Sequence, residues 1–200
     1  QAQADLVRAE QDARLVPLRE LVTTRHAFGE LPFQVAAAAF RQESASAHVP
    51  VTFAISYADL GHQKVADSEH YIVGLLAQLL REDQSVVAEL EERAQFDLSS
   101  AEREKLSRPL LYQMPLQAPP GTYRLRAVVR DESSGAVGIK ERVVTVQPPA
   151  PELALSDILL ADEILDLPDP APAAAGLQPF TFGRFRIVPN VAASYPSGGA

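Results

Sequence analysis

Apolar and polar residues alternate along three stretches of the chain, at residues 31–40, 48–57 and 122–130. Alternation with a period of two is the pattern of a β-strand that buries one face. The residues expected to face inward are Phe33, Val35, Ala37 and Ala39, then Val49, Val51, Phe53, Ile55 and Tyr57, and finally Tyr123, Leu125, Ala127 and Val129. The stretch 48–57 is predicted to be a half-buried strand.

Further strands are expected at residues 70–80, 85–96, 110–116 and 139–146. The apolar run at 70–80 is short and leads into the polar turn 81–84, which favours two strands over a helix. A single helix from Val73 to Arg93 is the competing interpretation, because residues 75–80 have high helix propensity.

Short helical turns are also expected. Residues 58–67 are predicted to form a loop or a short helical turn. Ser99 with Glu102 at the capping-box distance indicates a second short helix.

The chain turns sharply at Pro119, Pro120 and Gly121, just before Tyr123. In Greek-key sandwiches a tyrosine at such a corner bonds through its hydroxyl to upstream backbone. The loop 131–135 ends in Gly135, which is able to take a positive φ in a hairpin. Strands and turns together predict a mainly β protein with an Ig-like or fibronectin-like antiparallel β-sandwich.

The two ends of the chain differ from the middle. Residues 2–15 have helical composition, and Pro17 interrupts a face formed by Leu15, Leu18 and Val22. Strands are expected at 153–161 and 185–190, with a loop at 166–179. The predicted organisation is a helical linker or docking segment at 1–29, an Ig-like sandwich at 30–147, a proline-rich linker at 148–152, and the incomplete beginning of a second β domain at 153–200.

Composition narrows the possible functions. Sixteen prolines fit strands separated by loops. The net charge of −8 disfavours nucleic acid and polybasic membrane contacts, which need concentrated basic surface. Disulfides and thiol chemistry are excluded because the chain has no cysteine. No apolar run reaches the ~20 residues of a membrane-spanning helix.

Residues with catalytic or metal-binding chemistry form no recognisable motif. The four histidines lack the spacing of a metal pair, and Gly-x-Ser-x-Gly is absent. Residues 97–101 resemble the Asp-x-Ser-x-Ser metal-adhesion motif, but Ala101 replaces the second serine. We therefore expect no enzyme activity, no cofactor and no metal. The weak calcium candidates, for which a solvated loop is the favoured interpretation, are Asp162, Glu163, Asp166 and Asp169.

The strand at 122–130 carries arginines on the face opposite its apolar residues. Arg124, Arg126 and Arg130 are expected to face outward and are the candidates for contact with a partner. Gly121, Tyr123 and Gly135 are expected to serve the fold.

Several motifs follow one another in a set order. They are Leu31-Pro32-Phe33, the strand pair around Glu82-Asp83-Gln84, Leu111-Tyr112, the run from Pro120 to Asp131, the run from Ser134 to Gly138, Leu155-Ser156-Asp157-Ile158, and Ile187-Val188-Pro189-Asn190. This order resembles the sandwich region that follows a von Willebrand factor A-like domain in large exported proteins of Acidobacteria and relatives, and the related GWxTD proteins. The resemblance covers most of the chain from residue 31. It implies a bacterial protein of the periplasm, cell surface or medium, with an A-like domain before Gln1 and another sandwich from about Ala200.

Three functions stay open at this point. The first is a non-catalytic protein–protein interaction or scaffolding segment of an exported multi-domain protein, which includes an accessory subunit of a membrane-associated envelope assembly. Its partners would be other proteins or neighbouring domains of the same chain. The second is a carbohydrate-binding or accessory sandwich of a secreted hydrolase, which the absence of tryptophan disfavours. The third is a calcium-stabilised adhesive domain.

Overall fold

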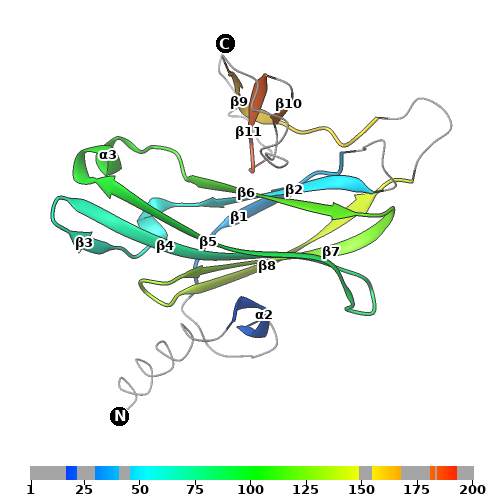
Figure 1. Ribbon diagram of the computed structural model, residues 1–200, viewed down its shortest axis with the longest axis horizontal. Coiled ribbons are helices and arrows are strands. Elements are labelled where there is room, and N and C mark those ends of the chain that lie inside the picture. The colour runs from blue at the N-terminus through cyan, green and yellow to red at the C-terminus, as the bar shows by residue number, and fades with distance from the viewer. Residues whose placement is uncertain are drawn as a thin grey trace.

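The computed structural model describes residues 17–21, 30–40, 46–148, 155–167, 181–182 and 184–192. Two antiparallel sheets lie face to face around one hydrophobic core, and a small third sheet is formed by the C-terminal strands (Figure 1). The protein is mainly β, as the alternation of apolar residues predicts.

The sheets are built from eleven strands among the described residues. The first sheet contains, in spatial order, β1 (Gln34–Ala37), β2 (Ala47–Ile55) and β6 (Leu110–Ala118). The second contains β3 (Gln63–Val65), β4 (Ser68–Leu80), β5 (Val86–Ser99), β7 (Gly121–Asp131) and β8 (Val137–Val146). The third contains β9 (Ala161–Asp166), β10 (Thr181–Phe182) and β11 (Phe185–Pro189).

The strand order is that of an Ig-like or fibronectin-like sandwich. β1, β2 and β6 take the places of strands A, B and E, and β4, β7 and β8 take those of C, F and G. β4 pairs with β5 along one edge and with β3 and β7 along the other, and β8 pairs with β7. The tyrosine corner thus lies between E and F, where sandwiches of this kind carry it.

Side chains that alternate into the space between the two large sheets form the core. All the inward-facing residues predicted for 31–40, 48–57 and 122–130 belong to it, with Ala37 and Tyr57 partly buried at its margin. The centre of the second sheet adds Tyr71, Val73, Leu75, Ala77 and Leu79. Each large apolar side chain buried in this way stabilises the fold by roughly 1.5–3 kcal/mol.

The hairpin of β4 and β5 confirms the prediction of two strands at 70–80 and 85–96. The competing interpretation, a helix from Val73 to Arg93, is wrong. Every residue from Val73 to Leu80 is buried, because both faces of β4 are covered. A continuous apolar run is the pattern of a strand buried on both faces.

β2 is more deeply buried than predicted. All nine of its residues are buried, so the strand is not half-buried. Its inner face carries the predicted apolar residues, and its outer face, with His48 and Thr52, is covered as well.

Two predicted segments differ from the structure. The short helical turn predicted within residues 58–67 is present as a 3₁₀ turn (Tyr57–Asp59), but it is followed by β3, a short strand that was not predicted. The strand expected at 153–161 is wrong over residues 155–160, which are irregular, and β9 begins only at Ala161. Leu155 and Ile158 are exposed, so no sheet buries the apolar positions that suggested a strand there.

Other predictions concern the ends of the chain. The strand expected at 185–190 is confirmed by β11. The helix predicted at 2–15, most of the linker at 148–152 and nearly all of the loop at 166–179 lie outside the described residues.

A short helix docks on the outer face of the second sheet. α2 (Leu18–Leu21) begins directly after Pro17, and Leu18 and Leu21 pack with Leu76, Val128 and Val137. Leu15 and Val22, the other residues expected on this face, lie outside the described residues. Figure 1 shows α2 on the side of the second sheet away from the first.

Tyr112 connects the two large sheets. Its hydroxyl donates a hydrogen bond from β6 to the Glu92 carboxylate on β5. Burial and this hydrogen bond raise the pKa of Tyr112 to about 12. The Tyr112 side chain is therefore a neutral phenol in the folded protein.

Residues 30–33 cross from the edge of the second sheet to the first sheet, and they pass beside Gly138. The Leu31 N–H donates to the Val137 carbonyl over 3.2 Å, and β1 begins three residues later. A Cβ atom on Gly138 would lie 2.2 Å from the Leu31 carbonyl oxygen and 2.8 Å from the Phe33 ring. Only glycine lets the crossing segment lie this close to β8.

Gly138→Ala is expected to lower the free energy of unfolding by about 2–3 kcal/mol, because the methyl group would overlap backbone that cannot move away. Urea unfolding followed by circular dichroism measures this loss. Gly74→Ala is the matched control, since its Cβ would lie 3.3 Å from a methyl group of the flexible Leu18 side chain. Equal stability of the two variants would contradict the prediction.

His48 is a buried histidine on the outer face of β2. It is 7% exposed, and its Nδ1 atom has no hydrogen-bond partner among the described residues. Burial lowers the pKa of His48 below its ordinary value of 6.5, because the charged imidazolium would lose its hydration. The folded state therefore holds this side chain neutral.

Stability is expected to fall as the pH drops below 6.5. The unfolded chain takes up a proton at His48 there, while the folded chain resists it until the pH passes the lower folded-state pKa. Thermal unfolding between pH 7.5 and 5 measures this loss, and His48→Gln should reduce it. His62→Gln, at a side chain that is 40% exposed, is the control for the loss of an imidazole elsewhere in the fold.

Candidate interaction surface

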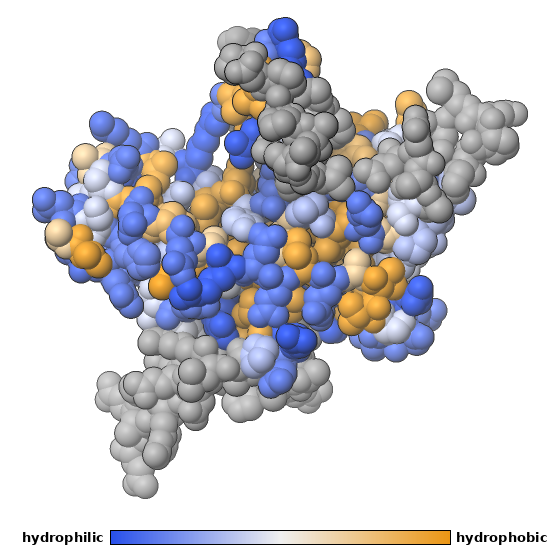
Figure 2. Space-filling view, viewed as in Figure 1, coloured by the Kyte–Doolittle hydropathy of each residue, from blue (hydrophilic) through white to orange (hydrophobic). Residues whose placement is uncertain are grey.

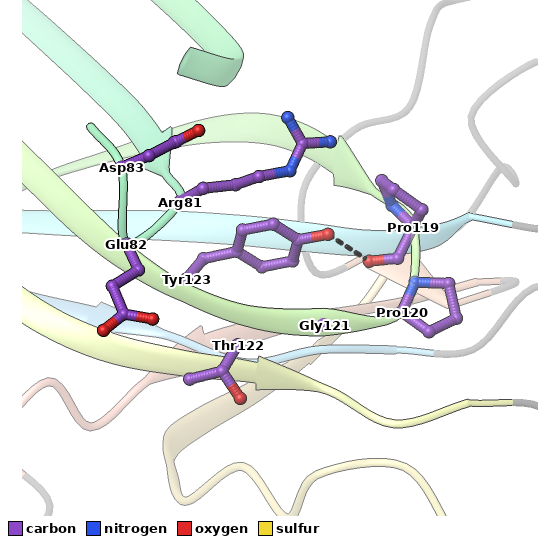
Figure 3. Close-up of a pocket in the computed structure, with 8 residues that line it drawn as sticks. All are labelled: Arg81, Glu82, Asp83, Pro119, Pro120, Gly121, Thr122 and Tyr123. Carbon is purple, nitrogen blue, oxygen red and sulfur yellow. Dashed lines mark hydrogen bonds between the residues drawn. The ribbon is translucent and has the colours of Figure 1, made fainter. Parts of the chain in front are cut away.

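The tyrosine corner forms as the sequence predicts. The Tyr123 hydroxyl donates a hydrogen bond of 2.7 Å to the Pro119 carbonyl, four residues upstream. A Cβ atom on Gly121 would lie 2.9 Å from that hydroxyl, so the corner requires glycine. Figure 3 shows the Tyr123 hydroxyl directed toward Pro119.

A shallow hollow of about 590 Å³ surrounds this corner. It is lined by Arg81, Glu82, Asp83, Pro119, Pro120, Gly121, Thr122 and Tyr123, with Arg81 beside the tyrosine ring (Figure 3). Asp83 accepts hydrogen bonds from the backbone and hydroxyl of Ser85, and these bonds lower its pKa. The Asp83 carboxylate thus stabilises the β4–β5 turn. Among the residues that line the hollow, no nucleophile is paired with a general base.

Gly135 also takes the predicted role. Its φ of +82° lies in the left-handed region. The Asp131 N–H donates to the Ala136 carbonyl, and the Gly135 N–H donates to the Asp131 carbonyl. This pattern is a hairpin loop that ends in a β-bulge with glycine at its first position.

Asp131 has a structural role that was not predicted from the sequence. This carboxylate is fully buried and accepts hydrogen bonds from the N–H groups of Gly61 (2.7 Å) and Ser133 (2.9 Å) and from the Ser134 hydroxyl. It ties the β7–β8 loop to the loop before β3. No sequence signal distinguishes it from a loop aspartate, because Gly61 lies seventy residues away.

The three arginines of β7 differ in exposure. The Arg124 side chain is 41% exposed and Arg126 is 19% exposed, whereas Arg130 is 9% exposed. Gly74, which pairs with Arg130, lies under Leu18 of α2. Arg130 pairs with Glu132 at 3.4 Å and is covered at this end of the sheet, so the prediction that it faces solvent is wrong.

Arg124 and Arg126 lie beside an exposed carboxylate of β8. Arg126 Nε donates to Glu141 at 2.8 Å, and Arg124 lies 3.7 Å from the same carboxylate. These two arginines stay candidates for a partner contact, with part of their charge balanced by Glu141.

β8 is the exposed edge of the second sheet. Residues 139–143 are all exposed, and two of them are apolar, Ile139 at 44% and Val143 at 74%. Among the described residues, the strand contact on its outer edge is a parallel bridge between Glu30 and Val137. Figure 2 shows apolar residues between charged ones on the face in view.

A second hollow, of about 360 Å³, lies beside β8. It is lined by residues of β1, β2 and β8 and of the segments next to these strands, which are Pro32, Phe33, Gln34, Ala54, Ser56, Asp59, Pro109 and Lys140. The Lys140 ammonium lies 5.6 Å from the centre of the Phe33 ring, within reach of a cation–π interaction.

The three calcium candidates that the structure describes do not converge on one point. Glu163 pairs with Arg108 at 2.6 Å, and Asp166 pairs with Arg184 at 2.5 Å. Asp162 neighbours Glu163 on β9, where adjacent side chains point to opposite faces, and Asp169 lies outside the described residues. No group of three or more histidine, aspartate or glutamate side chains suited to a metal occurs among the described residues.

The segment that resembles the metal-adhesion motif is a strand end and a helix cap. Ser99 caps α3 (Ser100–Lys105) and forms a capping box with Glu102, as predicted. These bonds lower the pKa of Glu102. Within the part of the chain that the structure describes, no helix is long and apolar enough to span a bilayer.

An aromatic cluster closes the core at the end near α3. Tyr71 and Phe96 stack at 5.1 Å, Tyr57 meets both rings edge-on, and the Arg103 guanidinium lies over Tyr57. The Tyr71 hydroxyl donates to Glu69. Because Tyr71 is almost fully buried, the cluster is part of the packing and offers no open aromatic platform.

Comparisons with known proteins add little. No family model matches the chain, and no curated protein matches it. Among solved structures, a β-glucuronidase from glycoside hydrolase family 2 shares 12% identity with a TM-score of 0.39, over 56% of this chain and 11% of that chain. The chain thus spans a small part of that enzyme's length, and this likeness carries no argument about activity.

Tyr123→Phe is expected to lower the free energy of unfolding by about 1–2 kcal/mol, because the Pro119 carbonyl loses its hydrogen-bond donor. Urea unfolding measures the change. Thr122→Val, at an exposed neighbour in the same strand, is the control and should be close to neutral. A phenylalanine variant as stable as the parent would show that the corner bond contributes nothing.

Proposed function

We propose that this chain is a non-catalytic protein–protein interaction or scaffolding segment of an exported multi-domain protein. The observation that carries the proposal is the edge strand β8, whose residues 139–143 are exposed although the core beneath the sheet is complete. Exposed apolar side chains on an edge strand favour contact with another chain. Arg124 and Arg126 flank this edge and supply adjacent positive charge.

Contacts between the sandwich and the C-terminal segment support the scaffolding part of the proposal. The Ala39 N–H donates to the Asp157 carboxylate at 2.8 Å, and the Asp157 N–H donates to the Ala39 carbonyl at 3.3 Å. Arg108 of the sandwich pairs with Glu163 of β9. Such contacts would hold a second β unit in a defined place beside the first.

The setting of the protein belongs to the proposal as well. The order of motifs that resembles sandwich regions after von Willebrand factor A-like domains supports a bacterial protein of the periplasm, cell surface or medium. It also supports neighbouring domains in a longer chain, and membership of a membrane-associated assembly.

Site-specific photo-crosslinking tests the proposal in cells that naturally make the protein. A photoreactive amino acid at Val143 is expected to give a discrete crosslink to another polypeptide or to a neighbouring domain. The same amino acid at Glu104, an exposed residue of α3, is the control and should give none at that mass. Identical patterns at both positions, or no crosslink at Val143, would argue against an interaction surface at this edge.

A further inference from the structure

The hydrogen-bonding direction of the β8 backbone follows from the hairpin. Asp131 donates to Ala136, and the register continues with Arg130 opposite Val137. Antiparallel pairs alternate between bonded and non-bonded, so Gly138, Lys140, Arg142 and Val144 direct their N–H and C=O groups to β7. The groups of Val137, Ile139, Glu141, Val143 and Thr145 then point away from the sheet. The bond from Leu31 to the Val137 carbonyl confirms this phase.

The β-bridge at Val137 shows that the outer edge of β8 can pair with another strand. Glu30 adds to β8 as a parallel partner, and the chain then leaves the edge for β1. From Ile139 to Thr145 the outward N–H and C=O groups continue, and the side chains of residues 139–143 and of Thr145 are exposed. The edge is therefore a template for a further strand.

The side chains of β8 define what such a strand would carry. Lys140 and Arg142 lie two residues apart on the face toward the first sheet, and Ile139, Glu141 and Val143 lie on the other face. Opposite charges and apolar pairs stabilise directly facing positions. A complementary strand thus carries two carboxylates with one residue between them, flanked by apolar residues.

The hollow beside Lys140 supports the same occupant. It lies next to Lys140 and is walled by Phe33, Pro32 and Pro109. A side chain of the added strand on the Lys140 face would enter this space. The Phe33 ring and the Lys140 ammonium would then contact its methylene and carboxylate groups.

A second copy of this chain fits the edge poorly. Two copies of β8 could pair antiparallel, with the cores of both molecules on the same side of the joined sheet. In the register in which Ile139 faces Val143 of the other copy, Lys140 faces Arg142 and Glu141 faces Glu141. Shifting that register by two residues sets Lys140 against Lys140 or Arg142 against Arg142. Like charges at facing positions destabilise a pair of strands.

We infer that β8 binds an extended segment of a different polypeptide as an added strand, with carboxylates facing Lys140 and Arg142 and apolar residues facing Ile139 and Val143. This inference rests on the proposed function, because it names the partner chemistry for the same edge. Main-chain hydrogen bonds to Ile139, Glu141 and Val143 supply the affinity, and the two cations select the sequence.

The first test measures binding of a short blocked peptide, Thr-Ile-Glu-Thr-Glu-Val-Thr, by fluorescence anisotropy. Lys140→Glu combined with Arg142→Glu should weaken binding about tenfold or more and should favour the peptide in which lysine replaces glutamate. Lys64→Glu combined with Lys105→Glu changes the net charge equally at exposed sites elsewhere and should leave binding unchanged. Equal loss in both double variants would overturn the inference, since net charge alone would then explain it.

The second test addresses the backbone. Val143→Pro removes an N–H that points away from β7, so the fold should persist while peptide binding falls about tenfold or more. Val143→Thr keeps this N–H and should retain most of the binding. Thermal unfolding of each variant confirms that the sandwich is intact. A folded proline variant that binds like the parent would overturn strand addition.

The two proposals fail in different ways. A first outcome is a crosslink at Val143 together with tight peptide binding that depends neither on the charge pattern of the peptide nor on Val143→Pro. It would support the proposed interaction surface and contradict the added strand. A second outcome is dimerisation in sedimentation experiments that is lost in Val143→Pro. It would show that β8 pairs with a second copy of this chain and would overturn the inference. Selective peptide binding without any crosslink in cells would support the inference and count against the proposed cellular contact.

Discussion

β4 is the element on which the rest of the structure depends. Its residues from Val73 to Leu80 are buried on both faces, and its backbone pairs with β5 along one edge and with β3 and β7 along the other. A strand in this position tolerates no unpaired polar group, because burial without a hydrogen bond costs several kcal/mol. β4 also joins the β7–β8 hairpin to the rest of the sheet through β7, and the inner face of β4 packs against the core side of β2.

The proposed interaction surface lies on the part of the second sheet that other segments leave exposed. α2 packs over Leu76, Val128 and Val137 on the outer face, and Arg130 is buried near that end of the sheet. Away from that end, Arg124, Arg126 and Glu141 form an open charged row, and β8 exposes residues 139–143. Among the described residues, the four-residue helix α2 covers only part of the outer face of the second sheet, and the interaction surface lies outside that part.

Much of the fold could be predicted because its signals are local. Alternation in 48–57 and 122–130 places every second residue on one face whatever the partner strand is. Tyr123 and Pro119 are four residues apart, and Gly135 follows its loop directly, so both turns are readable from neighbouring residues. The candidate surface was predictable only in part, because exposure of an outward residue depends on what packs over it. Arg130 and His48 show this, since both occupy outer faces that other segments cover.

The sequence by itself determined the phase of the large strands, the tyrosine corner, the bulged hairpin at Gly135 and the capped turn at Ser99. These features depend on steric and hydrogen-bonding preferences within a few residues. Only the tertiary structure decided that β2 is buried on both faces, that Asp131 is a buried acceptor for Gly61, and that β8 is left open while Arg130 is covered. Those outcomes depend on contacts between segments far apart in the chain, and the residues that make them carry no local mark of their partners.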